Sequence, residues 1–352
     1  MKQEWKEFLQ HAGAEFNADE TCVETFGNPE RERRIIHTGE LFCDLSHFGL
    51  IAAYGEDATE FLQGQFTNDI TEVSSTQSQL SSLCTPKGRM LCNFRIFKRE
   101  DTYYLVIPYE LLEAALDRLR MYVLRSRVTL EDASDALMRM GLNGNKMPGH
   151  LATIIGALPE AVDSCIETDG YTIIRVAGTM PRYEIYGLLE PMKKIWEGVD
   201  VHATAVGADP WELLNIQAGI PVINARSIDA YVPQMANMQL VNGVSFTKGC
   251  YPGQEIVARM HYLGKLKRRM YRIGFDASEK PQTGTALVTE SSTESQDIGS
   301  ILSAQKTPDG NYEALAVIQV KDAEASKLKL EDAKGPDINI LDLPYAFEEE
   351  SE

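Results

Sequence analysis

The sequence has 352 residues and lacks a long apolar run, a secretory leader pattern and an excess of positive charge. A transmembrane helix needs about 20 consecutive apolar residues, and no run approaching that length occurs. The first nine residues are acidic and mixed in character, without the apolar core of a secretory signal or the arginine-rich pattern of a transit peptide. We therefore expect a cytoplasmic protein that does not bind membranes.

Cysteines are few, and they are not arranged for disulfides or for a metal. The six show no CxxC pair and no regular spacing, which argues against a disulfide framework or a zinc site. An iron–sulfur cluster held by the chain alone would ordinarily need four suitably placed thiolates. We interpret the cysteines as reduced thiols and predict no resident metal. They are Cys22, Cys43, Cys84, Cys92, Cys165 and Cys250.

Basic residues number 34 against 52 acidic ones, which gives a formal net charge of −18. This charge opposes stable, non-specific binding to a phosphate backbone, so we expect no stable nucleic-acid binding. Two segments are locally basic despite this negative net charge. Residues 265–272 include five basic side chains, and residues 118–127 include four arginines. A solvated surface is the ordinary interpretation of each, and contact with an anionic ligand is the alternative.

Periodicity along the chain predicts an α+β protein, with helices and a strand meander interleaved. Apolar residues recur at helical spacing after Glu56 and again from 109 to about 123. Asp209 is predicted to cap a third helix with Pro210 at its first position and Glu212 bonding back to the cap, and Gly219 and Pro221 end it. The predicted strands are 47–54, 81–84, 90–97, 103–107, 171–176 and 183–186, followed by a small antiparallel barrel from 269–275, 286–288, 299–303 and 314–319.

One turn-forming segment concentrates reactive and polar side chains around Cys250. Its glycines and proline break regular structure, and turning loops often hold functional side chains. We predict that Lys248 and Arg259 favour the thiolate of Cys250. A rigid loop whose cysteine only fills space is the alternative. The other predicted contributors are Gly249 and Gly253 as turn residues, Tyr251 as a packing or hydrogen-bonding partner, Gln254 as a neutral orienter and Glu255 as a hydrogen-bond acceptor.

Residues 248–255 resemble the K-G-C-Y-x-G-Q-E motif of the YgfZ family, folate-binding proteins involved in iron–sulfur protein maturation and related to the T-protein of glycine cleavage. The resemblance implies a three-domain cloverleaf of aminomethyltransferase-like type around a central folate pocket, ending in a C-terminal antiparallel β-barrel. Weaker blocks at 43–47, 55–58, 61–64, 85–89 and 215–221 follow in the family's order.

Together, the pattern and the resemblance predict five parts in the chain. Residues 1–40 form an N-terminal extension, and 41–145 with 200–262 form an aminomethyltransferase-like folate-binding domain. The remaining parts are a second α+β subdomain at 146–199, the barrel at 265–345 and an acidic tail at 346–352.

A folate pocket needs an apolar or aromatic face for the flat pterin and side chains that hydrogen-bond its amide-like edge. By the resemblance, Phe48 and Trp211 match the aromatic folate-binding positions, and Gln217 stands where the T-protein has a glutamate that holds the pterin. The alternatives are an ordinary core position for Trp211 and a helix-surface position for Gln217. The implied cofactor is tetrahydrofolate or a one-carbon derivative, and its polyglutamyl tail would suit either basic segment.

The T-protein pattern G-G-x-x-D-D-L is altered here, because Cys92 and Asn93 stand in place of the two aspartates. Neither is a carboxylate able to stabilise a cationic intermediate of aminomethyl transfer. We therefore do not expect a classical aminomethyltransferase. A folate-dependent aminomethyl or methyl transferase with another acceptor is the alternative, and an interaction protein with a vestigial pocket is a third interpretation.

The leading hypothesis is a folate-binding protein that acts in assembly or repair of iron–sulfur proteins. Its clients would include enzymes such as tRNA methylthiotransferases, which makes the effect on tRNA modification indirect. Cys250 would act as a transient iron ligand, a nucleophile or a redox thiol, and the sequence leaves these three roles open. We expect the protein to work as a monomer.

Overall fold

The computed structural model describes residues 1–290, 298–325 and 327–347. Of the predicted acidic tail, residues 348–352 lie outside the described residues. The chain divides into two compact units: unit 1 comprises Met1–Gln63, Ile70–Gln79 and Phe94–Leu214, and unit 2 comprises Gly64–Asp69, Leu80–Asn93 and Asn215–Glu352. The five-part division made from the sequence stays a prediction.

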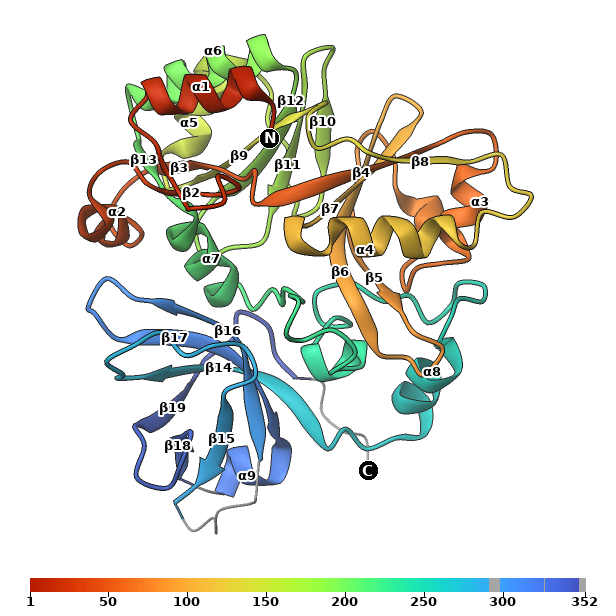
Figure 1. Cartoon of the computed structure of the whole chain (residues 1–352), viewed down its shortest axis with the longest axis vertical. Helices are drawn as coiled ribbons and strands as arrows, with labels where there is room; N and C mark the ends of the chain where they lie inside the picture. Colours follow the sequence, from red (N-terminus) through yellow and green to blue (C-terminus); the bar gives the residue numbers. More distant parts are fainter. Residues whose placement is uncertain (291–297, 326, 348–352) are drawn as a thin grey trace. The chain divides into compact units, whose positions relative to one another are not determined.

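A six-stranded sheet forms the centre of unit 1, with strand order β10-β11-β12-β9-β3-β13 (Figure 1). All neighbours in it are antiparallel except β13, which runs parallel to β3. Strands from both ends of unit 1's sequence therefore share one sheet. Their bounds are β3 Leu41–Asp44, β9 Met138–Asn143, β10 Cys165–Glu167, β11 Tyr171–Val176, β12 Arg182–Gly187 and β13 Thr204–Val206.

Helices cover one face of this sheet and bury an aromatic cluster against it. Trp5 and Trp196 meet edge to face at 5.7 Å, and Phe42 lies 4.6 Å from Trp196 between ring centroids. Trp5 also donates its indole N–H to Asp44 at 2.8 Å, so the first helix is fixed both by apolar burial and by a buried polar contact. The helices are α1 Gln3–His11, α5 Met147–Ile155 and α6 Leu189–Asp200.

The buried Glu32 ties α2 (Pro29–Ile35) to the strand before it and to the chain at residue 207. Its carboxylate accepts hydrogen bonds from Thr25 and from the backbone N–H groups of Phe26 and Gly207. A buried charge is tolerated when it is satisfied in this way. Two short antiparallel strands, β1 (Glu15–Phe16) and β2 (Val23–Thr25), precede α2 in the sequence.

The opposite face of the six-stranded sheet packs against α7 (Ala208–Gln217). The ring of Trp211 lies over Gly141 so closely that a Cβ added there would approach it to 2.8 Å, which explains the glycine. The predicted cap at Asp209 is wrong, because the helix already begins at Ala208. The predicted end is confirmed: Gly219 takes a positive φ of 66° just beyond the helix, as a terminating glycine does.

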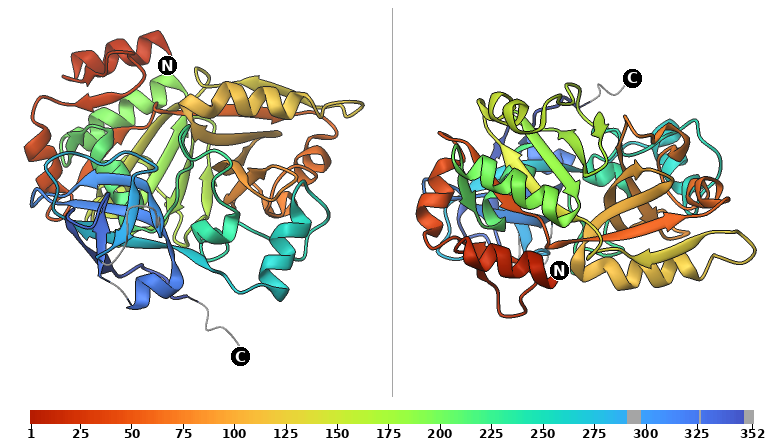
Figure 2. Two further views of the ribbon diagram at one scale, coloured as in Figure 1. Left: turned by 60° about the horizontal axis from the view of Figure 1, so that its bottom comes forward. Right: turned by 90° about the horizontal axis from the view of Figure 1, so that it is seen from above.

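A five-stranded sheet has the order β5-β6-β7-β4-β8, and α4 packs along β4 and β8 (Figure 2). Its strands confirm the predicted meander, and α4 ends at Arg120 rather than near residue 123. The bounds are β4 Phe48–Tyr54, β5 Gln79–Cys84, β6 Met90–Arg99, β7 Thr102–Pro108, β8 Thr129–Asp132, α3 Ala58–Gln63, η1 Ile70–Glu72 and α4 Tyr109–Arg120.

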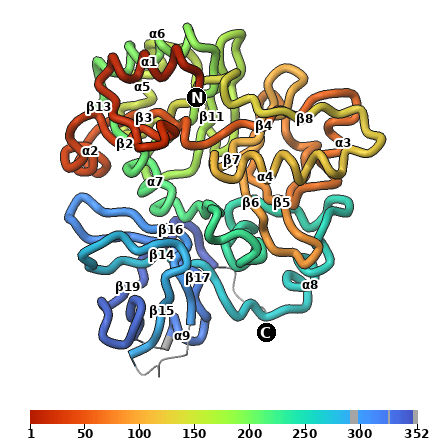
Figure 3. Tube along the Cα trace, viewed as in Figure 1, coloured from red at the N-terminus to blue at the C-terminus, as the bar shows by residue number. Residues whose placement is uncertain are grey.

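Unit 2 contains a closed six-stranded barrel in the order β14-β17-β16-β15-β18-β19 (Figure 3). Its alternating inward residues form their own hydrophobic core. The sequence predicted four of these strands, and the last two are short strands it did not identify. The bounds are β14 Arg268–Phe275, β15 Ala286–Thr289, β16 Gly299–Lys306, β17 Tyr312–Gln319, β18 Leu328–Leu330 and β19 Asp337–Leu341, with η2 Pro233–Ala236, α8 Gln254–Leu263 and α9 Val320–Ala325 elsewhere in the unit.

Candidate functional site

Cys250 is the exposed cysteine of the chain, on a loop of unit 2 directly before α8. The other five are buried or half-buried, and burial keeps their thiols protonated by raising each pKa. That pKa rises to about 12 for Cys22 and Cys92 and to about 11 for Cys165. Burial also raises the pKa of Cys43 and of Cys84. The structure describes all six cysteines, and Cys250 is the one exposed thiol among them.

Lys248 anchors this loop through its side chain rather than extending into solvent. Its ammonium donates hydrogen bonds to the backbone carbonyls of Phe66 at 2.6 Å and Asn68 at 3.0 Å. Burial lowers the pKa of Lys248 to about 8, and Asp69 acts in the opposite direction. The side chain thus ties the cysteine loop to the turn at 66–69, within the same unit.

Two glycines allow the same loop to lie against a second turn. Gly253 has φ +83°, and a Cβ there would approach the carbonyl oxygen of Thr85 to 2.4 Å and the Cα of Gly88 to 2.6 Å. Gly88 itself has φ +70° and lies against the side chain of Ile256. Gly249, by contrast, has no atom within 4 Å of the position that a Cβ would occupy. Close backbone approach therefore requires glycine at 88 and 253.

The other predicted residues at this loop differ in their contacts and in their burial. Gln254 donates from Nε2 to the carbonyl of Lys248 at 3.4 Å, which spans the loop. Tyr251 is buried, and the Lys248 ammonium lies 5.1 Å from its ring centroid. Glu255 and Arg259 are exposed on α8. Their predicted electrostatic roles toward the thiol stay predictions.

Cys92 and Asn93, at the altered aspartate positions, are both buried. Asn93 donates to the carbonyl of Pro221 at 2.7 Å and accepts from the N–H of Ile223 at 2.8 Å, within unit 2. These bonds fix the chain just after α7. Asn93 therefore has a structural task, and the protonated Cys92 thiol supplies no negative charge.

In unit 1, the structure brings Phe48 and Trp211 to the same hydrophobic cluster. Phe48 is half-buried at the start of β4, whereas Trp211 is fully buried. The guanidinium of Arg182 lies 4.0 Å from the centroid of the Trp211 ring and donates to the carbonyl of Ala177. The ring of Trp211 is therefore enclosed by other protein side chains within the cluster. Phe48, by contrast, remains partly exposed.

Gln217 is the last residue of α7 and belongs to unit 2. It is buried, and its Nε2 donates to Glu313 at 3.4 Å, a carboxylate that also pairs with Arg272 at 2.7 Å. The helix-surface alternative for Gln217 is therefore wrong, because the residue is 8% exposed. Its predicted contact with a pterin stays a prediction.

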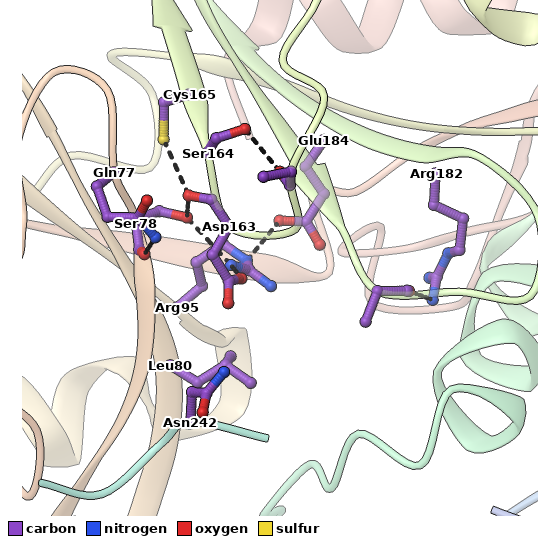
Figure 4. A network of polar contacts seen from close by, with 12 residues as sticks. Gln77, Ser78, Leu80, Arg95, Asp163, Ser164, Cys165, Arg182, Glu184 and Asn242 are labelled. Carbon is purple, nitrogen blue, oxygen red and sulfur yellow. Dashed lines mark hydrogen bonds and ion pairs between the residues drawn. The ribbon is translucent and has the colours of Figure 1, made fainter. Parts of the chain in front are cut away.

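Sequence reasoning missed a buried charged network in unit 1, which Figure 4 shows around Arg95. Its guanidinium pairs with Asp163 at 2.5 Å and with Glu184 at 3.3 Å. Burial opposes the charge of Arg95, yet the two carboxylates outweigh it and raise its pKa. Tyr186 donates to the same Oε2 of Glu184 at 2.7 Å, and burial raises the pKa of that phenol.

Of the two carboxylates that pair with Arg95, Glu184 has the more exposed side chain, 15% against 11% for Asp163. Its Oε2 receives both Arg95 and Tyr186, whereas Oε1 accepts no hydrogen bond from the residues that the structure describes. The sequence carried one signal for it, the alternation of Arg182, Glu184 and Tyr186 with apolar residues along a strand whose two faces are both buried.

The described residues offer no group of three or more His, Cys, Asp or Glu side chains placed to hold a metal ion. Within the same ranges, no helix is both long and apolar enough to cross a membrane.

Comparison with known proteins gives concordant results. The GCVT N-terminal domain model matches residues 6–163. The tRNA-modifying protein YgfZ of Yersinia pestis is 32% identical over 306 residues, covering 87% of this chain and 92% of the relative, and that of Photorhabdus laumondii is 32% identical over 308 residues with the same coverage.

A solved structure, glycine cleavage system aminomethyltransferase T from Bartonella henselae, aligns with a TM-score of 0.77 at 18% identity. The alignment covers 98% of this chain and 97% of that one, and it establishes an aminomethyltransferase-like fold. The two YgfZ relatives are more than 30% identical to this chain over most of both sequences, which shows membership of their family in addition to the fold. The chain therefore belongs to the YgfZ family.

Proposed function

We propose that this protein binds a reduced folate and acts in the assembly or repair of iron–sulfur proteins, with an indirect effect on tRNA modification. The clients would be cluster enzymes such as tRNA methylthiotransferases. The name of the relatives, tRNA-modifying protein, agrees with a tRNA-linked outcome. The strongly acidic chain favours a route through proteins over direct action on tRNA.

The observation that carries the proposal is the single exposed thiol. Cys250 sits on a loop that is held by the Lys248 ammonium and by backbone contact between Gly253 and Gly88. A thiol on a fixed loop loses little conformational freedom when it engages a partner. The five other thiols are shielded by burial, so chemistry at sulfur is directed to one position.

Cys250 would act as a temporary ligand for iron of a damaged or incomplete client cluster. The thiol first loses its proton to solvent, and the sulfur lone pair then forms a bond to an iron that has an open coordination position. No electron transfer is needed for that step. When the client's own ligand replaces it, the iron–sulfur bond to Cys250 breaks and the thiolate takes up a proton again.

Residues of unit 1 support a folate site. The pterin edge carries neighbouring N–H donors, and a carboxylate is the acceptor that matches them. Glu184 has one oxygen without a partner among the described residues and one fixed by Arg95 and Tyr186. Phe48 offers a half-buried aromatic ring, and Trp211 supports the cluster behind it. Bound tetrahydrofolate would supply a reduced pterin that carries or accepts one-carbon units.

Folate binding can be tested directly by calorimetric titration of the purified protein with tetrahydrofolate. We expect saturable binding that Glu184→Gln weakens, because the neutral amide replaces an acceptor oxygen with a donor. Glu190→Gln, at an exposed carboxylate on α6, is the matched control. Equal affinity in the two variants would remove Glu184 from the site, and no binding by the wild type would remove folate from the proposal.

The maturation role is tested by deleting the gene in its own host and measuring iron–sulfur-dependent methylthiolation of tRNA. The proposal predicts a loss that wild-type protein restores. Activity of an iron–sulfur enzyme that does not act on tRNA should fall in the same strain, because the effect is on the cluster. Loss of methylthiolation with normal activity of other cluster enzymes would contradict the proposed role.

A further inference from the structure

The end of α8 presents apolar and aromatic side chains to solvent in unit 2. Tyr262 is 64% exposed and Leu263 84% exposed, and Ile256 is 37% exposed nearer the start of the helix. Isolated exposed apolar residues are common, but several together on one helix mark an interaction site. We name Phe246, Ile256, His261, Tyr262 and Leu263 the α8 patch.

The α8 patch is ordered by ring contacts. His261 stacks on Phe246 with 3.7 Å between ring centroids and 8° between planes. Tyr262 meets the His261 ring at a steep angle of 71°, with 4.7 Å between centroids. These contacts hold His261 and Tyr262 in place, so a partner would not need to order them on binding. Rigid aromatic side chains on a surface are typical anchors of protein interfaces.

Charge around the α8 patch is opposite to that of the whole chain. Residues 245–269 contain six basic residues and one acidic residue, whereas the full sequence has a net charge of −18. Arg259, Lys265 and Lys267 are exposed within this segment. An apolar centre with a basic rim is the arrangement that selects a partner of negative charge.

We propose that the α8 patch docks an acidic protein partner, specifically the cluster enzyme that Cys250 serves. This inference rests on the proposed function, because it names the client as the occupant. Leu263 and Ile256 suit an apolar protein surface better than nucleic-acid bases, which require ring faces for stacking.

The position of the patch relative to the thiol supports this occupant. Cys250 lies four residues before α8, and α8 has ten residues and is therefore about 15 Å long. That length lies within the span of one standard interface, which buries about 800 Å² on each partner. A client seated on Tyr262 and Leu263 would thus be held alongside the cysteine loop.

A second basic and apolar segment provides a matched control in unit 1. Leu124 is 86% exposed, close to the value for Leu263, and Arg125 is exposed beside it. This segment follows α4 and carries no cysteine. Matching substitutions in this segment and in the α8 patch remove similar surface charge and apolar area. A loss of binding that occurs for the α8 variants alone is therefore due to docking at α8.

Binding is measured with the purified, cluster-loaded tRNA methylthiotransferase of the same host as the probe. We expect Leu263→Ser to weaken binding by about tenfold or more, because it removes an exposed apolar side chain that the partner would bury. Lys265→Glu should weaken it by several-fold at low salt, with a smaller effect at high salt. Leu124→Ser and Arg125→Glu should bind within about twofold of wild type.

Equal losses at the two segments, or no binding by the wild type, would overturn the assignment of α8 as the docking surface. A short single-stranded RNA serves as the competing probe: RNA binding that is lost in Lys265→Glu while client binding is retained would assign the patch to nucleic acid instead.

Complementation of the deletion strain separates this inference from the proposed function. Rescue by wild type but not by Leu263→Ser supports docking. Rescue by both contradicts docking and leaves the maturation role standing, whereas failure of wild type to rescue contradicts the proposed function itself.

Discussion

Substituting alanine for Gly253 forces a Cβ atom into a space bounded by backbone. The added atom would lie 2.4 Å from the carbonyl oxygen of Thr85, and 2.6 Å and 2.7 Å from the Cα and N of Gly88. Real Cβ contacts are not that short, and backbone cannot move aside as the end of a flexible side chain can. The cysteine loop and the turn at 85–88 must separate.

Two costs add in this variant. Holding alanine at φ +83° costs about 1–2 kcal/mol, because the left-handed region is unfavourable to residues with a Cβ. Displacing the turn adds steric strain of similar size, so we expect the free energy of unfolding to fall by about 3 kcal/mol. For a unit of this size that corresponds to a decrease in Tm of roughly 6–12 °C.

Gly249→Ala is the matched control in the same loop. It has a φ outside the positive region and nothing within 4 Å of the new atom, so its Tm should change by less than about 2 °C. Both variants are compared by differential scanning calorimetry. Equal Tm values for Gly253→Ala and Gly249→Ala would refute the inference that backbone contact fixes the loop.

The thiols, the buried arginine and the buried lysine each give a further prediction. Titration with Ellman's reagent should give one fast-reacting thiol in the native protein and none in Cys250→Ala; a second fast thiol would contradict the burial of the others. Arg95→Met should destabilise unit 1 by about 3–5 kcal/mol because it leaves the buried Asp163 and the partly buried Glu184 without a cation. Arg127→Met, at an exposed ion pair, should cost under about 1 kcal/mol, and equal losses would count against the network. Lys248 has a pKa of about 8 in the folded protein and 10.5 as its ordinary value. The unfolded chain therefore binds more protons between these values, so stability should rise relative to Lys248→Met as pH increases from 8 to 10.5, and a flat difference would contradict the burial of the ammonium.

The fold could be predicted from sequence where local patterns are strong. The strands at 90–99 and 102–108 are short runs rich in apolar residues that are bounded by turn residues, and they are buried along most of their length. The cap of α7 was predicted wrongly because Asp209 and Pro210 are as acceptable in the first turn as at the cap. The strands β18 and β19 have three and five residues, which is too short a stretch for alternation to identify a strand, and in the structure they pair with each other and with other barrel strands.

The candidate site shows a similar division. The loop at 248–255 is identified by its motif, yet the structural tasks of Lys248 and Gly253 depend on residues 66–68 and 85–88, which are distant in sequence. Glu184 and Arg95 lie on different strands, and only the folded unit 1 brings them within hydrogen-bond distance. Trp211 could be assigned to the core or to a ligand from sequence, and its burial depends on Gly141.

Cys250 is proposed as the group through which the protein supports its clients, and its removal tests the proposal directly. Wild type, Cys250→Ala and Cys92→Ala are expressed in the deletion strain, and methylthiolated tRNA is quantified by mass spectrometry. We expect restoration by wild type and by Cys92→Ala, whose thiol is buried, and no restoration by Cys250→Ala at equal protein level. Full restoration by Cys250→Ala would show that the exposed thiol is not needed.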